Sequence, residues 1–330
     1  MTLAQALSRT IDNTLEVSIV TSFTRIGYHA RRRLERWRPA ETYDFNGRVV
    51  VLTGATSGLG KAAATQLARG GATLVVVGRD AARNELAVGE IVKASGNTAI
   101  TQVAADLGNK AQVRALAQRV LADHDRLDVL VHNAGALNPD RQVSADGTEA
   151  TVASQVVGPF LLTSLLLTRL SESAPSLVLT MSSGGMYTAG LTVSELEMSE
   201  ADYQGSQQYA RAKRAQVTLN ELWATRFGDQ GVHYHALHPG WADTPGVRES
   251  LPGFARIFGP LLRTPDEGAD TLVWLAGDDK ALAGNGGFWL DRRTRPLHRL
   301  PKTRRTDTPD QRAQLWDWVA HRAGMDVGQG

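Results

Sequence analysis

Residues 49–61 read Val-Val-Val-Leu-Thr-Gly-Ala-Thr-Ser-Gly-Leu-Gly-Lys, and they are the strongest indication of the fold. The apolar run at 49–53 predicts a buried strand, and the glycines after it predict a tight turn into a helix that opens at about Gly58. Glycines at such a turn let the backbone approach a pyrophosphate, whose charge is met by amide groups at the helix N-terminus. The stretch therefore predicts a dinucleotide-binding strand-turn-helix unit.

A nucleoside triphosphate loop is the alternative interpretation of a glycine-rich turn. Such a loop needs a glycine five residues before its last one, and a serine or threonine after its lysine to hold magnesium. This chain has Ala55 and Ala62 at those two positions. The triphosphate interpretation therefore fails twice.

Outward from this unit, short runs rich in β-branched residues alternate with longer amphipathic segments. The expected strands are 49–53, 73–77, 98–103, 128–132, 177–181, 233–237 and 287–290. This alternation is typical of a doubly wound parallel sheet with helices on both faces. We predict an α/β fold, a Rossmann-type sheet of about seven strands in a single domain.

The chain divides into three parts around that sheet. Residues 1–45 are expected to form an N-terminal amphipathic helical extension, 46–290 the Rossmann-type domain, and 291–330 a basic segment with a terminal helix that runs from Thr308 and Pro309 to Gly324. Two segments, 184–208 and 240–265, are long for connections after the fifth and sixth strands. Ligands bind beyond the carboxyl ends of parallel strands, so these segments are candidate walls and lid of a substrate site.

Composition excludes several classes of function. The 330 residues include no cysteine, which excludes disulfides, thiolate metal sites and a cysteine nucleophile. The net charge is only +2, and two basic runs, 31–38 and 292–305, are expected to be solvated faces. We predict a cytoplasmic protein with no nucleic-acid partner. We also predict no metal site, even at His233, His235 and His238, which lie close together in the sequence.

The N-terminal segment has apolar residues at helical spacing, at Leu15, Ile19, Phe23 and Ile26. It lacks the continuous apolar run of a signal peptide or a membrane span. Two interpretations stay open: a helix packed on the domain or on a second subunit, and a helix that lies on a membrane surface with arginines at the headgroups.

The end of the second predicted strand bears on cofactor choice. An acidic side chain there would bind the ribose 2′-hydroxyl and repel a 2′-phosphate, whereas this chain has Gly78 and Arg79. Arg79 therefore favours NADP(H) over NAD(H), although Asp80 follows it directly. Arg83 either adds a second positive contact or faces solvent.

Tyr209 and Lys213 are four residues apart on a predicted helix, so both project from one face. A tyrosine with its ordinary pKa near 10 is a poor acid-base catalyst at neutral pH, and a neighbouring ammonium favours the phenolate. The pair is therefore a candidate proton donor and acceptor.

Five short motifs follow one another along the chain, and their order is informative. They are Thr53-Gly54-x-x-x-Gly58-x-Gly60, Asn133-Ala134-Gly135, Ser182-Ser183, Tyr209-x-x-x-Lys213 and Pro239-Gly240. As a set they resemble the short-chain dehydrogenase/reductase family over about residues 46–290. The stretches 182–185, 238–248 and 268–271 are also similar to the branch called dehydrogenase/reductase SDR family member 12, which has an N-terminal helical extension too.

The resemblance implies hydride transfer between nicotinamide and a carbonyl or alcohol substrate. It implies that Ser183 hydrogen-bonds the substrate oxygen, with Ser182 separated from it only by order on the strand, that Tyr209 donates or removes the proton, and that Lys213 lowers the tyrosine pKa and binds the nicotinamide ribose. Asp106 is expected to meet the adenine. The remaining cofactor residues that it implies are Thr53, Gly54, Thr56, Ser57, Gly58, Leu59, Gly60, Arg79, Leu107, Asn133, Ala134, Gly135, Pro239, Gly240 and Thr244.

One position departs from the family pattern. The family usually has an asparagine on the helix after the fourth strand, which holds a water in a proton relay through the lysine, and alignment on residues 158–160 puts Gln155 there. Glutamine keeps the amide and adds a methylene, so we expect a slower or retuned relay. The rival interpretation is a non-catalytic dinucleotide-binding regulatory or scaffold protein.

Two expectations concern partners. Leu, Met, Phe and Trp side chains in residues 185–259 favour an apolar small-molecule substrate. The resemblance further implies a homo-oligomer that pairs through the helices carrying Gln155 and Tyr209.

Overall fold

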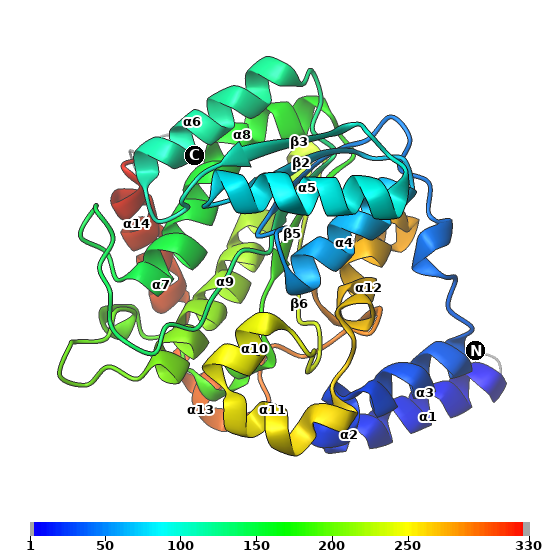
Figure 1. Cartoon of the computed structure of the whole chain (residues 1–330). Coiled ribbons are helices and arrows are strands. Elements are labelled where there is room, and N and C mark those ends of the chain that lie inside the picture. Colours follow the sequence, from blue (N-terminus) through cyan, green and yellow to red (C-terminus); the bar gives the residue numbers. More distant parts are fainter. Residues whose placement is uncertain (1–2, 326–330) are drawn as a thin grey trace.

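One sheet lies between two layers of helices in the computed structural model, which describes residues 3–325 and side chains from residue 10 onward (Figure 1). The strands lie in the order β3 (Ile100–Ala104), β2 (Thr73–Gly78), β1 (Val49–Thr53), β4 (Val129–His132), β5 (Ser176–Met181), β6 (Val232–Leu237), β7 (Phe288–Leu290) and β8 (Arg293–Thr294). All neighbours pair in parallel except β7 and β8. The predicted doubly wound parallel sheet is confirmed. The sequence pattern missed only β8, which has two residues and thus no periodicity.

Alternate residues of the central strands supply two separate cores. Val49 and Val51 of β1 pack under α6 (Lys110–Asp123), α8 (Gly158–Glu172), α9 (Gly205–Phe227) and α14 (Pro309–Ala323). Val50 and Leu52 pack under α4 (Gly58–Arg69), α5 (Ala81–Ser95) and α12 (Pro265–Gly277). Because both faces are covered, the central strands read as continuous apolar runs.

One helical stretch in the core that contains Val49 and Val51 is unusually apolar. Among the described residues, one helical stretch, 150–172, is long and apolar enough to cross a membrane. Of its apolar 18-residue segment, 72% is buried inside the fold. It comprises α7 (Ala150–Val152), the π-helical turn η2 (Ala153–Val157) and α8. Its composition is thus that of a central core helix.

The C-terminal helix α14 begins and ends where the sequence predicts. Thr308 precedes it and caps its first turn, and Gly324 ends it in the left-handed conformation. Trp316 lies 4.9 Å from both Phe160 and Trp223, measured between ring centres. The helix therefore covers the outer face of α8 and α9.

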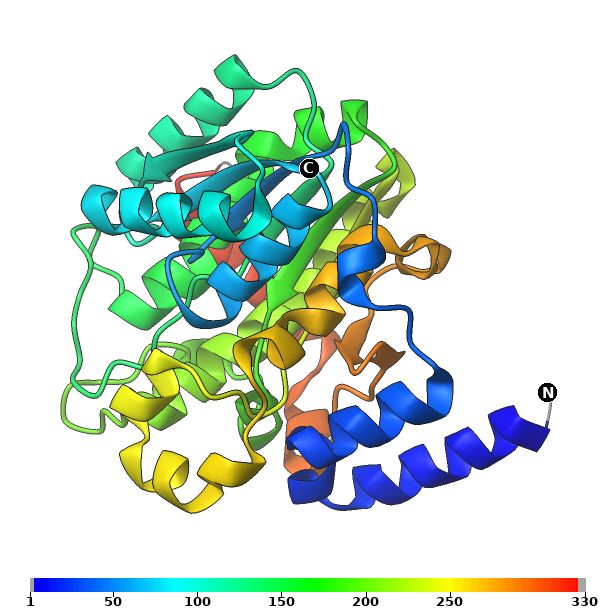
Figure 2. The same cartoon turned by 45° about the vertical axis from the view of Figure 1, so that its right-hand side comes forward.

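The N-terminal extension contains three helices where the apolar spacing predicts one. α1 (Leu3–Val17), α2 (Ile19–Phe23) and α3 (Arg25–Glu35) fold back as a hairpin against the domain (Figure 2). Extended backbone at Ser18 and Thr24 breaks the helix. Phe23 is consequently buried at 3% exposure, whereas Ile19 and Ile26 are 48% and 46% exposed. The expectation of one continuous apolar face is wrong, because helical spacing holds only along an unbroken helix.

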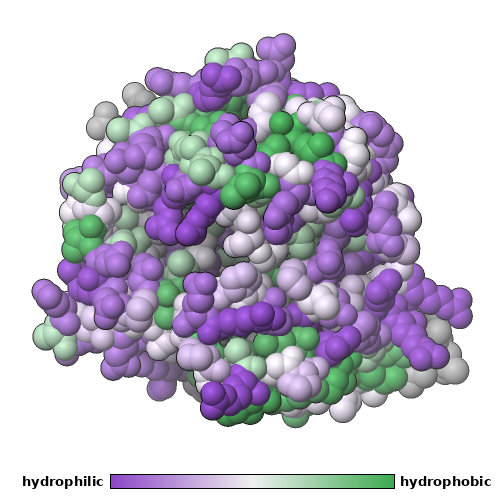
Figure 3. Space-filling model, in the orientation of Figure 1, coloured by the Kyte–Doolittle hydropathy of each residue, from purple (hydrophilic) through white to green (hydrophobic). Residues whose placement is uncertain are grey.

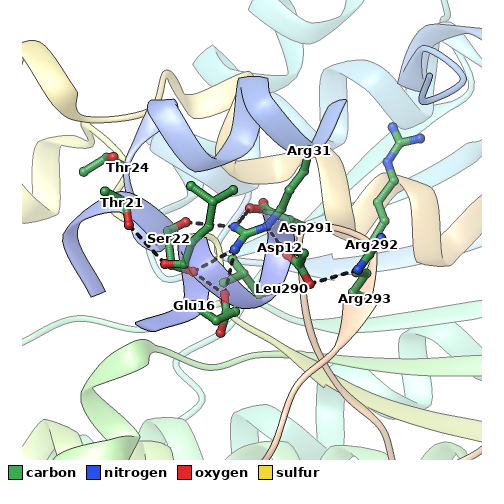
Figure 4. A network of polar contacts seen from close by, with 12 residues as sticks. Asp12, Glu16, Thr21, Ser22, Thr24, Arg31, Leu290, Asp291, Arg292 and Arg293 are labelled. Carbon is green, nitrogen blue, oxygen red and sulfur yellow. Dashed lines mark hydrogen bonds and ion pairs between the residues drawn. The ribbon is translucent and has the colours of Figure 1, made fainter. Parts of the chain in front are cut away.

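The basic runs are not wholly solvated. Arg31 is 1% exposed, and Arg292 and Arg295 are 8% and 9% exposed. Figure 4 shows Arg31 held among Asp12, Glu16 and Asp291, with nitrogen–oxygen distances of 2.5–2.7 Å. The expectation of solvated faces is wrong for these arginines, because their carboxylate partners come from distant parts of the chain.

Candidate active site

Positions 54 and 60, at the turn between β1 and α4, admit only glycine. A Cβ on Gly60 would lie 2.1 Å from the Gly54 carbonyl oxygen, and one on Gly54 would lie 2.7 Å from Ala134 Cα. The side chain of Ser57 does not cap α4, so the first amide groups of that helix remain available to an anion. The turn is thus a cradle that fits a pyrophosphate.

Two of the predicted cofactor residues support this cradle from behind. Thr53 is fully buried, and its hydroxyl accepts hydrogen bonds from the backbone amides of Asn133 (3.0 Å) and Ala134 (3.1 Å). The Asn133 side chain donates to the carbonyls of Thr53 and Gly54, both at 3.0 Å. These contacts tie the end of β1 to the end of β4.

The charged side chains that follow β2 are exposed to solvent. Arg79 and Arg83 are exposed, and the carboxylate of Asp80 accepts the backbone amide of Arg83 at 2.8 Å as the N-cap of α5. Sequence reasoning missed Asn84, whose buried amide donates to the carbonyls of Gly78 and Val103. It holds the ends of β2 and β3 together, and a single polar residue in a helix carries no local signal for that role.

After β3 come two more predicted residues. Asp106 is half-buried, and its carboxylate accepts the Gly108 amide at 2.9 Å. Leu107 is buried at 5% exposure, and its carbonyl oxygen faces Gly158, where a Cβ would come within 2.1 Å. These contacts fix the loop that follows β3 against α8.

Near its first turn, α9 presents Tyr209 and Lys213 from one face, as the spacing predicts. The ammonium nitrogen of Lys213 lies 5.2 Å from the centre of the Tyr209 ring and donates to the Met181 carbonyl at 3.0 Å. Lys213 is buried at 2% exposure. The amine is thus held between the phenol and the end of β5.

Of the two serines that follow β5, only one meets the phenol. The Ser183 hydroxyl lies close enough to the Tyr209 hydroxyl to lower its pKa, and the Ser183 oxygen accepts the Gly185 amide at 3.1 Å. Ser182 is buried and donates to the Lys213 carbonyl at 3.2 Å. The structure therefore brings Ser183, and not Ser182, together with Tyr209 and Lys213.

The electrostatics of the free site run against the simple expectation of an acidic phenol. Burial raises the pKa of Tyr209 to about 12, and the hydrogen bond from Ser183 opposes that rise. Burial also lowers the pKa of Lys213 to about 7. The effect of burial on the Tyr209 pKa thus exceeds the opposing effect of Ser183, and the phenol is protonated at neutral pH.

Gln155 lies where the alignment puts it, beside the lysine. Its amide donates to the Ala136 carbonyl at 2.7 Å, and its side-chain oxygen is buried without a hydrogen-bond partner among the described residues. A Cβ on Gly135 would lie 3.1 Å from that oxygen and 3.3 Å from the Lys213 nitrogen. An unpaired acceptor and an amine therefore border the same small space.

The carbonyl of Gln155, in the π-helical turn η2, receives a hydrogen bond from another helix. Pro159 has no N–H, so the carbonyl of Gln155, four residues earlier, has no helical donor. Gln216 of α9 supplies one, at 2.6 Å from its side-chain nitrogen. Sequence reasoning missed Gln216, although the proline four residues after Gln155 signals a free carbonyl.

The segment after β6 crosses the cradle. Thr244, the N-cap of α10 (Pro245–Ser250), places its methyl carbon 3.2 Å from where a Cβ on Gly58 would stand. The following helix, α11 (Pro252–Phe258), packs Phe254 and Phe258 on Trp241, with ring centres 4.9 and 5.1 Å apart. The predicted residues Pro239, Gly240 and Thr244 all lie on this segment.

The histidines near β6 make ordinary structural contacts. His233 hydrogen-bonds the Gly284 carbonyl at 3.0 Å and His235 the Ala281 carbonyl at 2.7 Å. Within residues 3–325, no three potential metal ligands cluster.

Comparison with known proteins shows which family the chain resembles. A family model described as short chain dehydrogenase matches residues 48–253. Dehydrogenase/reductase SDR family member 12 of Homo sapiens is 39% identical over 270 residues, which are 82% of this chain and 84% of that protein. Retinol dehydrogenase 12 of Bos taurus is 37% identical over 281 residues, 84% of this chain and 87% of that protein. A Pseudomonas aeruginosa RhlG/NADP active-site complex, 23% identical, has a TM-score of 0.62 and covers 76% of this chain and 96% of its own.

Proposed function

The chain belongs to the short-chain dehydrogenase/reductase family, and we propose that it is an NADP(H)-preferring member that reduces an apolar carbonyl compound to its alcohol. The observation that carries the proposal is the grouping of Ser183, Tyr209 and Lys213 at the carboxyl end of β5. This group lies at the edge of the sheet where a parallel α/β fold binds its ligands.

The proton chemistry follows from the free site. A bound nicotinamide cofactor would supply the hydride, with its pyrophosphate in the cradle at residues 54–60 and its ribose near Lys213. Tyr209, protonated at neutral pH because its pKa is about 12, donates a proton to the carbonyl oxygen. Ser183 donates a hydrogen bond to the same oxygen and stabilises the charge that develops there.

Reprotonation of Tyr209 is assigned to Lys213 and Gln155. The unpaired oxygen of Gln155 and the Lys213 amine border the space above Gly135, which suits a bridging water. Glutamine thereby takes the place of the asparagine in the family's relay.

A carbonyl screen tests the proposed function. We expect the purified protein to oxidise NADPH with apolar aldehydes or ketones, and Tyr209→Phe to lose that turnover by about 10²- to 10⁴-fold. Tyr203→Phe, which removes a hydroxyl that bonds the Asn138 carbonyl and Glu149 outside the catalytic group, is the matched control. Equal background rates in wild type and Tyr209→Phe across a broad panel would instead favour the non-catalytic dinucleotide-binding protein.

The preference for NADP(H) rests on two exposed arginines, Arg79 and Arg83, at the end of β2. The one acidic neighbour, Asp80, is engaged by the α5 backbone, and the RhlG complex contains NADP. Arg79→Asp should weaken NADPH binding far more than NADH binding, whereas Lys93→Asp at the far end of α5 should change neither. An unchanged preference in Arg79→Asp would remove this assignment.

A cytoplasmic protein with peripheral membrane contact is our proposal for its location. Val17, Ile19, Val20, Ile26 and Ile257 are 38–87% exposed, and apolar residues gather along the lower edge of the molecule over α2 and α11 (Figure 3). The exposed basic residues of the neighbouring helices are Arg25, Arg32, Arg33, Arg36 and Arg256. Apolar side chains ringed by arginine suit an anionic phospholipid surface.

Vesicle sedimentation tests that surface. The protein should sediment with phosphatidylglycerol vesicles more than with phosphatidylcholine vesicles, and Val17→Asp with Ile257→Asp should abolish the difference. Leu86→Asp, 70% exposed on α5, is the matched control. Failure of the wild type to bind either vesicle, or self-association that the double substitution removes, would contradict a lipid partner.

Members of the family commonly pair through the helices that carry Gln155 and Tyr209. We propose that this chain does not pair through them. α14 packs over both helices, with Leu315, Trp316 and Val319 buried against them. A partner subunit would have to displace this helix. Sedimentation velocity should accordingly give a monomer, and a dimer that α14 substitutions leave intact would refute the idea.

A further inference from the structure

The break between α2 and α3 leaves the carbonyls of Ser22 and Phe23 without helical donors, because Thr24 is extended and α2 ends at Phe23. The segment after β6 supplies donors to both: the Trp241 amide lies 2.7 Å from the Phe23 oxygen, and Arg263 lies 3.0 Å from the Ser22 oxygen. Arg263 also lies 3.3 Å from the Thr24 oxygen, which accepts the Tyr28 amide as well. Residues 22–24 are therefore bonded directly to the candidate substrate loop.

The Phe23 side chain reaches the other wall of the site. Its ring lies so close to Gly184 that a Cβ there would be 2.6 Å from Phe23 Cε2. It also packs edge-on against His238 and Trp241, with ring centres 4.3 and 6.0 Å away. One buried ring thus contacts both segments that enclose the candidate substrate site.

Gly184 lies between the two groups that set the position of the candidate catalytic serine. Ser183 precedes it, and the amide of Gly185 after it donates to the Ser183 oxygen. A change in the backbone at Gly184 would therefore move the Ser183 hydroxyl relative to Tyr209. The Phe23 ring limits that change by occupying the space beside Gly184.

Buried charges hold the extension in this position. Arg263 and Arg31, each 1% exposed, both pair with the fully buried carboxylate of Asp291. Arg31 also donates to the Ser22 carbonyl at 3.0 Å. The break at residues 22–24 is consequently fixed from the extension side and from the loop side by the same carboxylate.

We infer that residues 22–24 of the N-terminal extension form a positioning element of the active site, in which Phe23 holds both the Ser183–Gly185 turn and the loop after β6 in the arrangement that turns over substrate. This inference rests on the proposed function. Among the described residues, no backbone hydrogen bond joins residues 22–24 to the cradle at 54–60. Phe23 therefore governs the carbonyl end of the site and leaves nucleotide binding alone.

Substitution of Phe23 tests the inference by a split between two measurements. Phe23→Ala should lower kcat/KM for the carbonyl substrate by about 10- to 100-fold, as expected for a misplacement of about 1 Å. Its NADPH dissociation constant should stay within about twofold of the wild type. Phe23→Leu should restore part of the activity, and Leu34→Ala on the exposed face of α3 is the matched control. A Phe23→Ala protein with wild-type kcat/KM would overturn the inference.

A double-mutant cycle separates positioning from general damage. Gly184→Ala places a methyl group against the Phe23 ring and should lower kcat/KM by a similar factor. In a Phe23→Ala background that clash is gone, so adding Gly184→Ala should cost much less. Additive losses would show that the extension and the serine turn are not coupled, and would overturn the inference even if Phe23→Ala folded poorly.

Amide hydrogen exchange gives a readout that needs no substrate. Exchange at residues 183–187 and 239–243 should accelerate in Phe23→Ala, while exchange at 54–60 should not change. If the wild type reduces no carbonyl but Phe23→Ala still shows this change in exchange, the proposed function fails and the structural coupling stands. Unchanged exchange at both segments, with turnover intact, would remove the positioning element.

Discussion

Asp291 offers the sharpest test of how the extension is held. Its carboxylate is fully buried, receives Arg31 at 2.5 Å and binds both terminal nitrogens of Arg263 at 2.6 and 2.9 Å. Burial alone would raise its pKa, but Arg263 and Arg31 hold the pKa below its usual range. Asp291→Asn is the cleanest change, because residue 291 has φ +54 and asparagine tolerates that conformation well.

The size of the loss follows from which arginine is left unpaired. Arg31 keeps Asp12 and Glu16 at 2.6 and 2.7 Å, whereas the other hydrogen-bond partners of Arg263 are backbone carbonyls. One buried guanidinium without a carboxylate costs about 3–5 kcal/mol. For a domain of this size, that loss lowers the melting temperature by about 4–7 °C.

Urea and thermal unfolding of three variants decide the matter. Asp243→Asn, which removes the partner of the 68% exposed Arg248, should cost less than about 1 kcal/mol. Asp291→Asn combined with Arg263→Met removes both charges and should recover part of the loss. The reasoning would be refuted if Asp291→Asn stayed within about 1 kcal/mol of wild type, or if the double variant were no more stable than the single.

Three further outcomes follow from the candidate site. Burial lowers the pKa of Lys213 from 10.5 to about 7, so the unfolded chain binds this proton more tightly than the folded protein does. The Lys213 contribution to the free energy of unfolding should therefore rise by about 1 kcal/mol per pH unit from pH 7 to 9 in urea titrations, and Lys213→Met should lose that rise. Gly60→Ala, whose Cβ would meet the Gly54 carbonyl at 2.1 Å, should weaken NADPH binding at least about tenfold by calorimetry. Gly89→Ala, with nothing within 4 Å of its Cβ, should leave that binding unchanged. Gln155→Leu should lower kcat without changing nucleotide affinity, by at most about 10²- to 10⁴-fold, and a wild-type kcat would remove Gln155 from the relay.

The sequence alone determined the parts of this protein that depend on neighbours along the chain. The run at 49–53 and the glycines after it predicted β1, the turn and the start of α4 at Gly58, because strand burial, tight turns and helix starts are set within a few residues. The same locality placed Tyr209 and Lys213 on one face of α9, and ended α14 at Gly324. The family resemblance, which the comparisons confirm, rests on these local motifs.

Tertiary structure alone decided what depends on distant partners. Arg31 looks like a surface charge in sequence, but Asp291 lies 260 residues away, and no periodicity connects them. The choice of Ser183 over Ser182, the donor that Gln216 gives to the Gln155 carbonyl, and the pKa values of Tyr209 and Lys213 depend likewise on which groups are buried together. Desolvation and charge pairing depend on which groups the fold brings together, so only the folded chain reveals that the N-terminal extension reaches the candidate active site.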